Sequence, residues 1–141
     1  MDETDLAILR ILQEDASISF IEIARRLRIS ESTVRKRVEK MRREGVIKRF
    51  TVVIDPPKIG FNAVAMIGID VDPSKVLEVV QKLCELPETK SVATSMGDHM
   101  IMAEVWAKNT MELLKIINEK IAVIDGVKRV CPAIILEKIK E

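Results

Sequence analysis

The stretch FIEIARRLRISESTVRKRVEKMRREG, residues 20–45, decides the fold of the first part of the chain. Ser19 precedes Glu22 by three positions, which is the spacing of a capping box and predicts a helix beginning at "FIEIARRL". The tripeptide "RIS" predicts a tight turn, and Ser30 is the expected N-cap of a further helix that runs to about Glu44. Two short helices joined by a tight turn are typical of a helix-turn-helix motif.

The second of these helices is predicted to have two different faces. At about 100° per residue, Val34, Val38 and Met41 share one narrow stripe, which we expect to pack on the preceding helices. The opposite arc carries Ser32, Arg35, Lys36, Glu39, Lys40 and Arg43. Residues 25–49 hold eleven basic and three acidic residues, a net charge of +8 in a chain whose total is only +1. A solvated charged face is the plain alternative, but such a local positive excess favours contact with DNA.

The expected DNA contacts follow from the geometry of the motif. The N-terminal part of the second helix enters the major groove, and its side chains reach base edges. Within a helix-turn-helix at about 21–40, the expected contacts to bases are Glu31, Ser32, Thr33, Arg35 and Lys36. Ser30, at the start of the helix, is also expected to be part of the DNA-binding surface. The expected contacts to phosphates are Arg25, Arg26, Lys40, Arg42, Arg43, Lys48 and Arg49.

The sequence on either side of this motif completes a first domain. An apolar pattern from Leu6 to Leu12 predicts a first helix. "VIKRFTVVI", residues 46–54, is rich in β-branched residues and predicts a strand, either a wing or the route out of the domain. "DPPKIG" follows, and its two prolines interrupt helix and strand alike. We therefore predict a DNA-binding domain over 1–54, a hinge over 55–61 and a second domain over 62–141.

The second domain is predicted to alternate strands and helices. Strands are expected at 61–72, 89–96, 99–107 and 126–139, with helices at 73–86 and 110–124 and a "GD" turn between the middle strands. The order βαββαβ is that of a ferredoxin-like fold, an antiparallel sheet with both helices on one face. The fold class is therefore α+β, with an N-terminal, winged-helix-like helix-turn-helix domain and a C-terminal ferredoxin-like domain.

Both faces of this sheet are predicted to be apolar. In the last strand Val130, Pro132, Ile134 and Leu136 alternate with Cys131, Ala133, Ile135 and Ile139. The first strand is apolar on both sides as well, whereas a solvated face would carry polar residues. We therefore expect another subunit's sheet to cover the second face, so that the domain forms a homo-oligomer.

The composition argues against an enzyme. One histidine, two cysteines and no tyrosine leave few groups for acid–base or nucleophilic catalysis, and we expect no cofactor and no metal site. Asp70 and Asp72 suggest a metal pair, but Asp72 stands before Pro73 and is more simply an N-cap. His99 and Asp98 are neighbours on a predicted strand, so they should point to opposite faces and form no dyad.

The chain is expected to be cytoplasmic. No run approaches the length of a membrane span, and the start "MDETDLAILRIL" is acidic where an export signal would be basic.

Three motifs resemble the Lrp/AsnC family, the leucine-responsive or feast/famine transcription regulators of bacteria and archaea. They are the opening "MDETDLAILRILQEDA", the run "EIARRLRISESTVRKRVEKMRREGVIKRFTVVIDPPKIG" and the later "GD" turn, and they span essentially the full length. The run from "GDHMIMAEVWAK" to "VCPAIILEK" resembles an archaeal, Thermococcales-type branch. The resemblance implies a ligand-response domain that dimerises through its sheet, and assembly into tetramers or octamers.

The resemblance also implies an amino-acid effector, bound near the loop of Ser95, Met96, Gly97 and Asp98. The family commonly has a second acidic residue two positions after this aspartate, where the chain has Met100. The loss of that carboxylate brings the response to amino acids into question or indicates a different ligand.

The sequence thus predicts a sequence-specific transcription regulator that binds double-stranded, pseudo-palindromic sites as a dimer or higher oligomer. It would repress its own promoter and act on genes of amino-acid metabolism. Two alternatives stay open: an architectural protein that wraps DNA with little specificity, and an amino-acid-sensing module.

Overall fold

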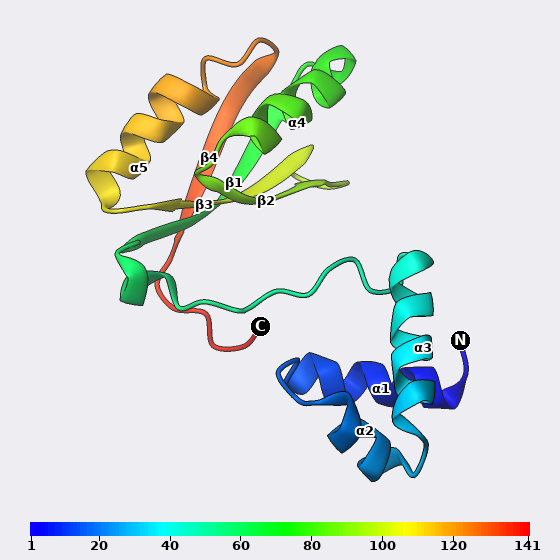
Figure 1. Ribbon diagram of the computed structural model, residues 1–141. Coiled ribbons are helices and arrows are strands. Elements are labelled where there is room, and N and C mark those ends of the chain that lie inside the picture. The colour runs from blue at the N-terminus through cyan, green and yellow to red at the C-terminus, as the bar shows by residue number, and fades with distance from the viewer. The chain divides into compact units, whose positions relative to one another are not determined.

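The computed structural model describes residues 1–141, and they divide into two compact units (Figure 1). The N-terminal unit is Met1–Val53 and the C-terminal unit is Ile54–Glu141. Each unit has its own cluster of buried apolar side chains. The expected hinge at 55–61 begins the C-terminal unit, where Pro56–Ile59 forms a 3-10 turn that ends at Gly60, with a φ of 96°.

The N-terminal unit consists of three helices. They are α1 (Glu3–Glu14), α2 (Phe20–Leu27) and α3 (Glu31–Arg43). Their buried side chains are Ile8, Leu12, Ile23, Ala24, Val34, Val38 and Met41. The stripe predicted on α3 is therefore confirmed as its core face. This small core fixes how α3 is held against the other two helices.

Side-chain caps begin each of these helices. Ser19 accepts a hydrogen bond from the backbone N–H of Glu22, and Ser30 accepts one from Thr33, both as expected. The Glu22 side chain binds arginines instead of returning to Ser19, so the predicted capping box is only half formed. A complete box occurs at α1, between Asp2 and Asp5.

The strand predicted over 46–54 is absent, and that prediction was wrong. The chain continues from Gly45, whose φ is 76°, in an irregular course without ladder hydrogen bonds. Val52 and Val53 are 74% and 72% exposed. β-branched residues favour an extended backbone, but a strand also needs a neighbour to pair with, and the N-terminal unit has no sheet. The segment is thus the route out of the unit rather than a wing.

The C-terminal unit is a four-stranded antiparallel sheet with two helices. In chain order its elements are β1 (Ala63–Val71), α4 (Val76–Glu85), β2 (Thr89–Thr94), β3 (Ile101–Ala107), α5 (Thr110–Ile116) and β4 (Val127–Ile135). The strands lie in the order β2-β3-β1-β4, and all pairs are antiparallel. This confirms the βαββαβ prediction. A π-helical turn, Ile117–Ile121, continues α5.

The expected capping residues Asp72 and Asn109 both accept hydrogen bonds from the backbone that follows them, although α4 itself begins after Lys75 without a side-chain cap. Asp72 accepts a hydrogen bond from the N–H of Ser74 at 3.0 Å, and Asn109 accepts one from Glu112 at 2.8 Å. The first helical turn after Asp72 is a 3-10 turn, Pro73–Lys75, which precedes α4. Asp72 is therefore a capping residue, as the following proline predicted.

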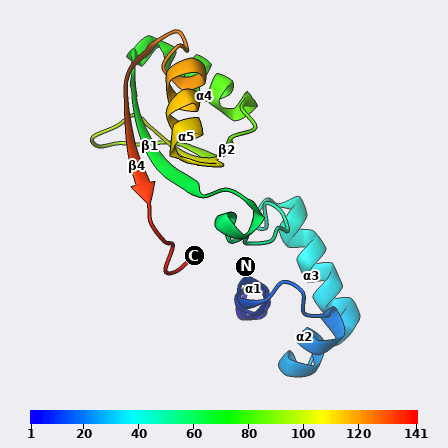
Figure 2. The ribbon, with the colours of Figure 1, turned by 90° about the vertical axis from the view of Figure 1, so that its left-hand side faces the viewer.

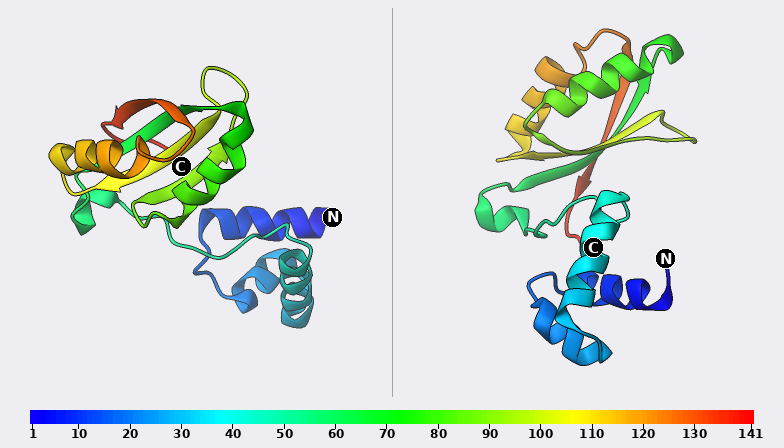
Figure 3. Two further views of the ribbon diagram at one scale, coloured as in Figure 1. Left: turned by 90° about the horizontal axis from the view of Figure 1, so that it is seen from above. Right: turned by 45° about the vertical axis from the view of Figure 1, so that its right-hand side comes forward.

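Helices α4 and α5 cover one face of the sheet (Figures 2 and 3). On that face Ala65, Ile67 and Ile69 of β1 are fully buried against the helices. The other face, called the open face here, carries alternate residues of the central strands and of β4. It includes Val64, Met66, Gly68 and Asp70 of β1, Met102, Glu104 and Trp106 of β3, and Cys131, Ala133 and Ile135 of β4. The open face is thus largely apolar, as predicted, but Asp70, Glu104 and Arg129, which pairs opposite Asp70, add charge to it.

Strand β4 is shorter than predicted. It ends at Ile135, and Leu136 beyond it is 97% exposed. Pro132 and Ile134 point to the helix side, because they pair with Ile67 and Ala65. Ile134 is nevertheless 48% exposed, since β4 is an edge strand at which the helical cover ends.

Candidate nucleic-acid interface

The turn between α2 and α3 is set by one strained residue. Arg28 ends α2 with a φ of 57°, and no other residue except glycine has a positive φ. A left-handed residue with a side chain costs about 1–2 kcal/mol. A hydrogen bond of 3.1 Å from the N–H of Ile29 to the carbonyl of Ala24 offsets part of this cost. Ser30 then begins α3, so the turn has the short form of a helix-turn-helix.

The polar arc predicted on α3 is exposed to solvent. Val34, Val38 and Met41 are at most 3% exposed, so the opposite side of the helix faces outward. The exposed residues of that side are Ser32, Arg35, Lys36, Glu39, Lys40 and Arg43. The arc therefore presents five basic or hydroxyl side chains and one acid on a single surface.

Three hydroxyl groups gather where α3 begins. Ser30 Oγ lies 3.1 Å from Ser32 Oγ and 2.7 Å from Thr33 Oγ1. Rotation of these hydroxyls can aim a donor or an acceptor outward. The free N–H groups of the first helical turn add partial positive charge, which favours an anion such as phosphate.

Arg35 is held within the protein by two neighbours. Its guanidinium binds Glu31 at 2.5 Å and lies over the ring of Phe20, 5.4 Å from the centroid. Lys36 beside it makes no ion pair. Of the two basic residues expected to contact bases, Lys36 is therefore free, and Arg35 must exchange Glu31 for a new partner.

Arg25 and Arg26 of α2 share one acid. Both guanidiniums bind Glu22, at 2.5 Å and 3.2 Å. These hydrogen bonds, chiefly that from Arg25, lower the pKa of Glu22 to about 2. The positive charge available to phosphates at this point is therefore one unit, not two.

Arg37 has a structural role that the sequence did not reveal. It binds Asp2 at 2.6 Å and Asp5 at 3.1 Å, and so joins α3 to the start of α1. The hydrogen bond from Arg37, with a smaller one from the N–H of Asp5, lowers the pKa of Asp2 to about 2. Arg37 lies next to the buried stripe on the helical wheel, which is the signal that separates it from the exposed basic residues.

The remaining basic residues differ in their freedom. Lys40 reaches Glu44 only at 4.0 Å, and Arg42 lies over the ring of Phe50 at 5.4 Å. Arg43, Lys48 and Arg49 are exposed and make no ion pair. These five side chains form the group expected to contact phosphates beyond the first turns of α3.

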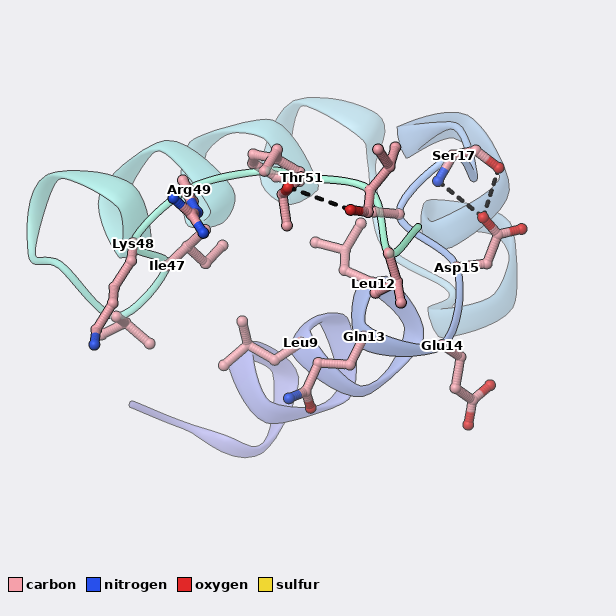
Figure 4. A pocket seen from close by; sticks show the side chains of 15 residues that line it. Leu9, Leu12, Gln13, Glu14, Asp15, Ser17, Ile47, Lys48, Arg49 and Thr51 are labelled. Carbon is pink, nitrogen blue, oxygen red and sulfur yellow. Dashed lines mark hydrogen bonds between the residues drawn. The ribbon is translucent and has the colours of Figure 1, made fainter. Parts of the chain in front are cut away.

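A groove of about 680 Å³ lies elsewhere in the N-terminal unit (Figure 4). Leu9 and Leu12 of α1 line one side, and the segment from Val46 to Val53 lines the other. No lining residue comes from α3, so the groove is separate from the exposed arc. Its lining is mostly apolar, with Lys48 and Arg49 among its polar residues.

The loop expected to contact an effector is longer than the predicted two-residue turn. Strands β2 and β3 end and begin at Thr94 and Ile101, and the N–H of Ser95 donates to the carbonyl of Met100 at 2.9 Å. Gly97 has a φ of 144°, which favours glycine, and Met96 is fully exposed. Ser95, Gly97 and Asp98 are exposed as well, whereas Met100 packs against the core of the C-terminal unit. Met100 is therefore separated from the exposed loop residues at 95–98 that the effector is expected to contact.

His99 binds an acid, but not its sequence neighbour. Its Nδ1 lies 3.0 Å from Oδ1 of Asp70 on β1, while Asp98 is exposed in the loop. Cys131 of β4 completes a cluster with these two residues. The three are far apart in the chain, and sequence reasoning did not find them.

No helix of the protein has the length and apolar character needed to cross a membrane.

Comparison with known proteins defines the class. A family model described as winged helix-turn-helix DNA-binding matches residues 1–48, and the Lrp/AsnC ligand binding domain matches residues 64–141. The HTH-type transcriptional regulator LrpA of Pyrococcus horikoshii is 49% identical over 140 residues, which cover 99% of each chain. The protein is therefore a transcriptional regulator with a helix-turn-helix DNA-binding domain. It belongs to the Lrp/AsnC family, as the sequence motifs indicated, and such relatives are described as regulators rather than enzymes.

Solved structures agree with this assignment. AsnC of E. coli superposes with a TM-score of 0.86 at 25% identity, covering 100% of this chain and 95% of that one. A transcriptional regulator of Neisseria meningitidis in complex with L-Met superposes with a TM-score of 0.89 at 18% identity, covering 100% and 93%. The second likeness concerns the fold alone.

Proposed function

We propose that the protein is a sequence-specific regulator that binds pseudo-palindromic sites in double-stranded DNA, represses its own promoter and acts on genes of amino-acid metabolism. The observation that carries the DNA-binding part is the exposed arc of α3, with its hydroxyl groups and unpaired basic residues. The promoter and the sign of regulation rest on the family.

The first two turns of α3 supply the contacts to bases. Lys36 can reach a guanine without losing a partner, and Ser32 and Thr33 can donate or accept through their hydroxyls. Arg35 gives up an exposed ion pair, which is worth about 0.2–1 kcal/mol. A bidentate contact to guanine is worth about 1–3 kcal/mol of discrimination, so the exchange is favourable at a matching site.

Binding to the protein's own promoter is the direct test. Footprinting should show a protected site, and Arg35→Ala with Lys36→Ala should weaken binding there while affecting random duplex less. Lys115→Ala is the matched control, because Lys115 is an exposed lysine of α5 without an ion pair. Unchanged affinity of the double variant for the promoter would refute the assigned contacts.

The salt dependence separates the contacts to phosphates from those to bases. Lys40→Ala and Arg43→Ala should weaken binding to all duplexes, and each lost contact should lower the slope of log affinity against log salt by about 0.9. A ratio of affinities near one between promoter and random duplex would instead favour the architectural, DNA-wrapping alternative.

The open face of the sheet is proposed as the dimer surface. Most of its side chains are apolar, among them Met66, Ala133 and Ile135, while Glu104 lies opposite Met66 on β3, and the protein's own helices cover only the other face. Met66→Glu should place a charge in this interface and give a monomer in sedimentation experiments. Leu77→Glu, at an 82% exposed position of α4, is the control and should leave the assembly unchanged. A Met66→Glu protein that sediments like the parent would exclude the open face.

The loop at 95–98 is proposed to respond to an amino acid. The Lrp/AsnC ligand-binding model covers this region, and a structural neighbour is described as a complex with L-Met. A ligand at 100 times its dissociation constant adds about 2.7 kcal/mol of stability, which a thermal-shift screen of the twenty amino acids would detect. Asp98→Asn should reduce any shift that the screen finds, whereas no shift for any amino acid would argue for a ligand-independent regulator.

A further inference from the structure

Three side chains with metal-binding atoms meet at one end of the open face. Asp70 comes from β1, His99 from the loop before β3, and Cys131 from β4. One ligand atom from each lies within 4.8 Å of the others. The cluster lies in the C-terminal unit, outside the arc of α3 and outside the exposed loop at 95–98.

A glycine makes this meeting possible. Gly68 pairs with Cys131 across the sheet, and Asp70 lies two residues further along the same face of β1. A Cβ at Gly68 would lie 2.2 Å from Cδ2 of His99, so the imidazole ring rests directly on the glycine backbone. Only glycine at this position allows the histidine to reach both Asp70 and Cys131.

The cluster gathers scarce residues. The chain has one histidine and two cysteines, and its other cysteine, Cys84, is exposed on α4. The side chains of Asp70 and His99 are 29% and 25% exposed, and Cys131 is also half-buried. In the single chain they are therefore shielded from bulk water yet open to an entering ion.

The plain alternative is an Asp–His hydrogen bond beside an unrelated thiol. The chemistry of the three side chains favours a metal site, because imidazole, thiolate and carboxylate are the three side-chain ligands of zinc in proteins. Nδ1 of His99 and Oδ1 of Asp70 are 3.0 Å apart, close to the separation of about 3.3 Å between two adjacent N and O ligands of tetrahedral zinc. Sγ of Cys131 lies within 4.8 Å of both atoms, so it has to approach by at most about 1.2 Å to reach a separation of about 3.6 Å from the other ligands.

We propose that Asp70, His99 and Cys131 form a zinc site within a single chain. The ion takes the place of the proton shared by Nδ1 and Oδ1, and Cys131 releases its thiol proton to solvent and supplies a thiolate. Three protein ligands leave the fourth tetrahedral position for water or another ligand. Arg129, which pairs opposite Asp70 in β4, makes no ion pair with it and leaves the carboxylate available. The site goes beyond the proposed function and does not depend on it.

Direct metal binding tests the site. Full-length protein without a histidine tag, first stripped with a chelator, should bind one zinc per chain in equilibrium dialysis. Co²⁺ in place of zinc should give the intense near-ultraviolet absorption of a thiolate–cobalt bond together with the visible bands of a tetrahedral ion. Absence of both the zinc and the thiolate band would overturn the proposal, and half a zinc per chain would overturn its single-chain form.

Variants assign the ligands. Cys131→Ser should abolish the thiolate band, and His99→Gln should weaken zinc binding by about 10-fold or more, by analogy with the loss of a supporting residue. Cys84→Ser is the matched control and should bind zinc like the parent. Circular dichroism and thermal unfolding without metal verify that each variant is folded. Parental affinity in Cys131→Ser or His99→Gln, or its loss in Cys84→Ser, would refute the assignment.

Discussion

The two units of the protein differ in what they leave exposed. The N-terminal unit has a core of seven apolar residues and presents a basic helix face, whereas the C-terminal unit has a core of fifteen and leaves an apolar sheet face open. The net charge is +3 over residues 1–50 and −2 over residues 51–141. One unit is thus suited to a polyanion and the other to a protein surface. The net charge of the whole chain, only +1, hides this difference between the two units.

The largest predicted effect follows from the small core of the N-terminal unit. Ile23 is fully buried, and Ile23→Ala should cost about 2–5 kcal/mol of stability. We expect calorimetry to show a lower transition for this unit and an unchanged one for the C-terminal unit, with DNA binding lost. Ile67 is fully buried in the sheet, so Ile67→Ala should lower the transition of the C-terminal unit and leave that of the N-terminal unit unchanged. A joint shift of both transitions would show that the units unfold together.

A crowded substitution in the C-terminal unit should have a smaller effect. Gly68→Ala places a Cβ 2.2 Å from the His99 ring, and overpacking of this kind costs about 1–3 kcal/mol. Only the transition of the C-terminal unit should fall in thermal unfolding. His99→Ala in the same chain removes the obstructing ring and should restore most of the loss. If the double variant is no more stable than Gly68→Ala, another contact causes the strain.

The cap of α3 is the next test. Ser30→Ala removes the acceptor for the N–H of Thr33 and should cost the N-terminal unit about 1 kcal/mol. Ser32→Ala, one residue inside the same helix, should change stability far less, because Ser32 bonds only to another hydroxyl. Chemical denaturation measures both, and equal losses would contradict the assigned cap.

The smallest predicted effect is a loss of stability at low pH, caused by protonation of Asp2. The pKa of Asp2 is held at about 2, below its ordinary 3.8, mainly by the hydrogen bond from Arg37. A depressed pKa contributes stability that is present above about pH 4 and is lost as the pH falls toward 2. Asp2→Asn keeps the capping oxygen but should flatten this part of the pH profile of the N-terminal unit. Glu3→Gln, beside it and without an ion pair, is the control. A profile as steep as the parent's would assign the acid sensitivity to other groups, such as Glu22.

Local signals in the sequence predicted most of the fold. The caps at Ser19, Ser30, Asp72 and Asn109 and the buried stripe of α3 depend on residues close together in the chain, and all are confirmed. The βαββαβ order and the family are confirmed as well. The DNA-contact and effector residues stay predictions.

Features that depend on residues far apart in the chain could not be predicted from local sequence patterns. The strand expected over 46–54 has no partner to pair with, although its residues favour one. Asp70 and His99 are 29 positions apart and meet only because the sheet brings β1 beside β3. Arg37 likewise finds Asp2 at a separation of 35 positions. In each case the tertiary arrangement decides, and no local pattern carries that information.

The irregular segment after α3 has a practical consequence. Lys48 and Arg49 are exposed on a backbone that belongs to neither helix nor sheet, which is the kind of site that proteases cleave first. Brief trypsin treatment of the protein alone should therefore cut here, in the irregular end of the N-terminal unit, before it cuts within the helices or the sheet. One fragment would then hold the three helices of the N-terminal unit and the other the whole C-terminal unit, each with its own core. Bound DNA that contacts these two residues should slow the cut, so the rate of cleavage becomes a simple readout of occupancy.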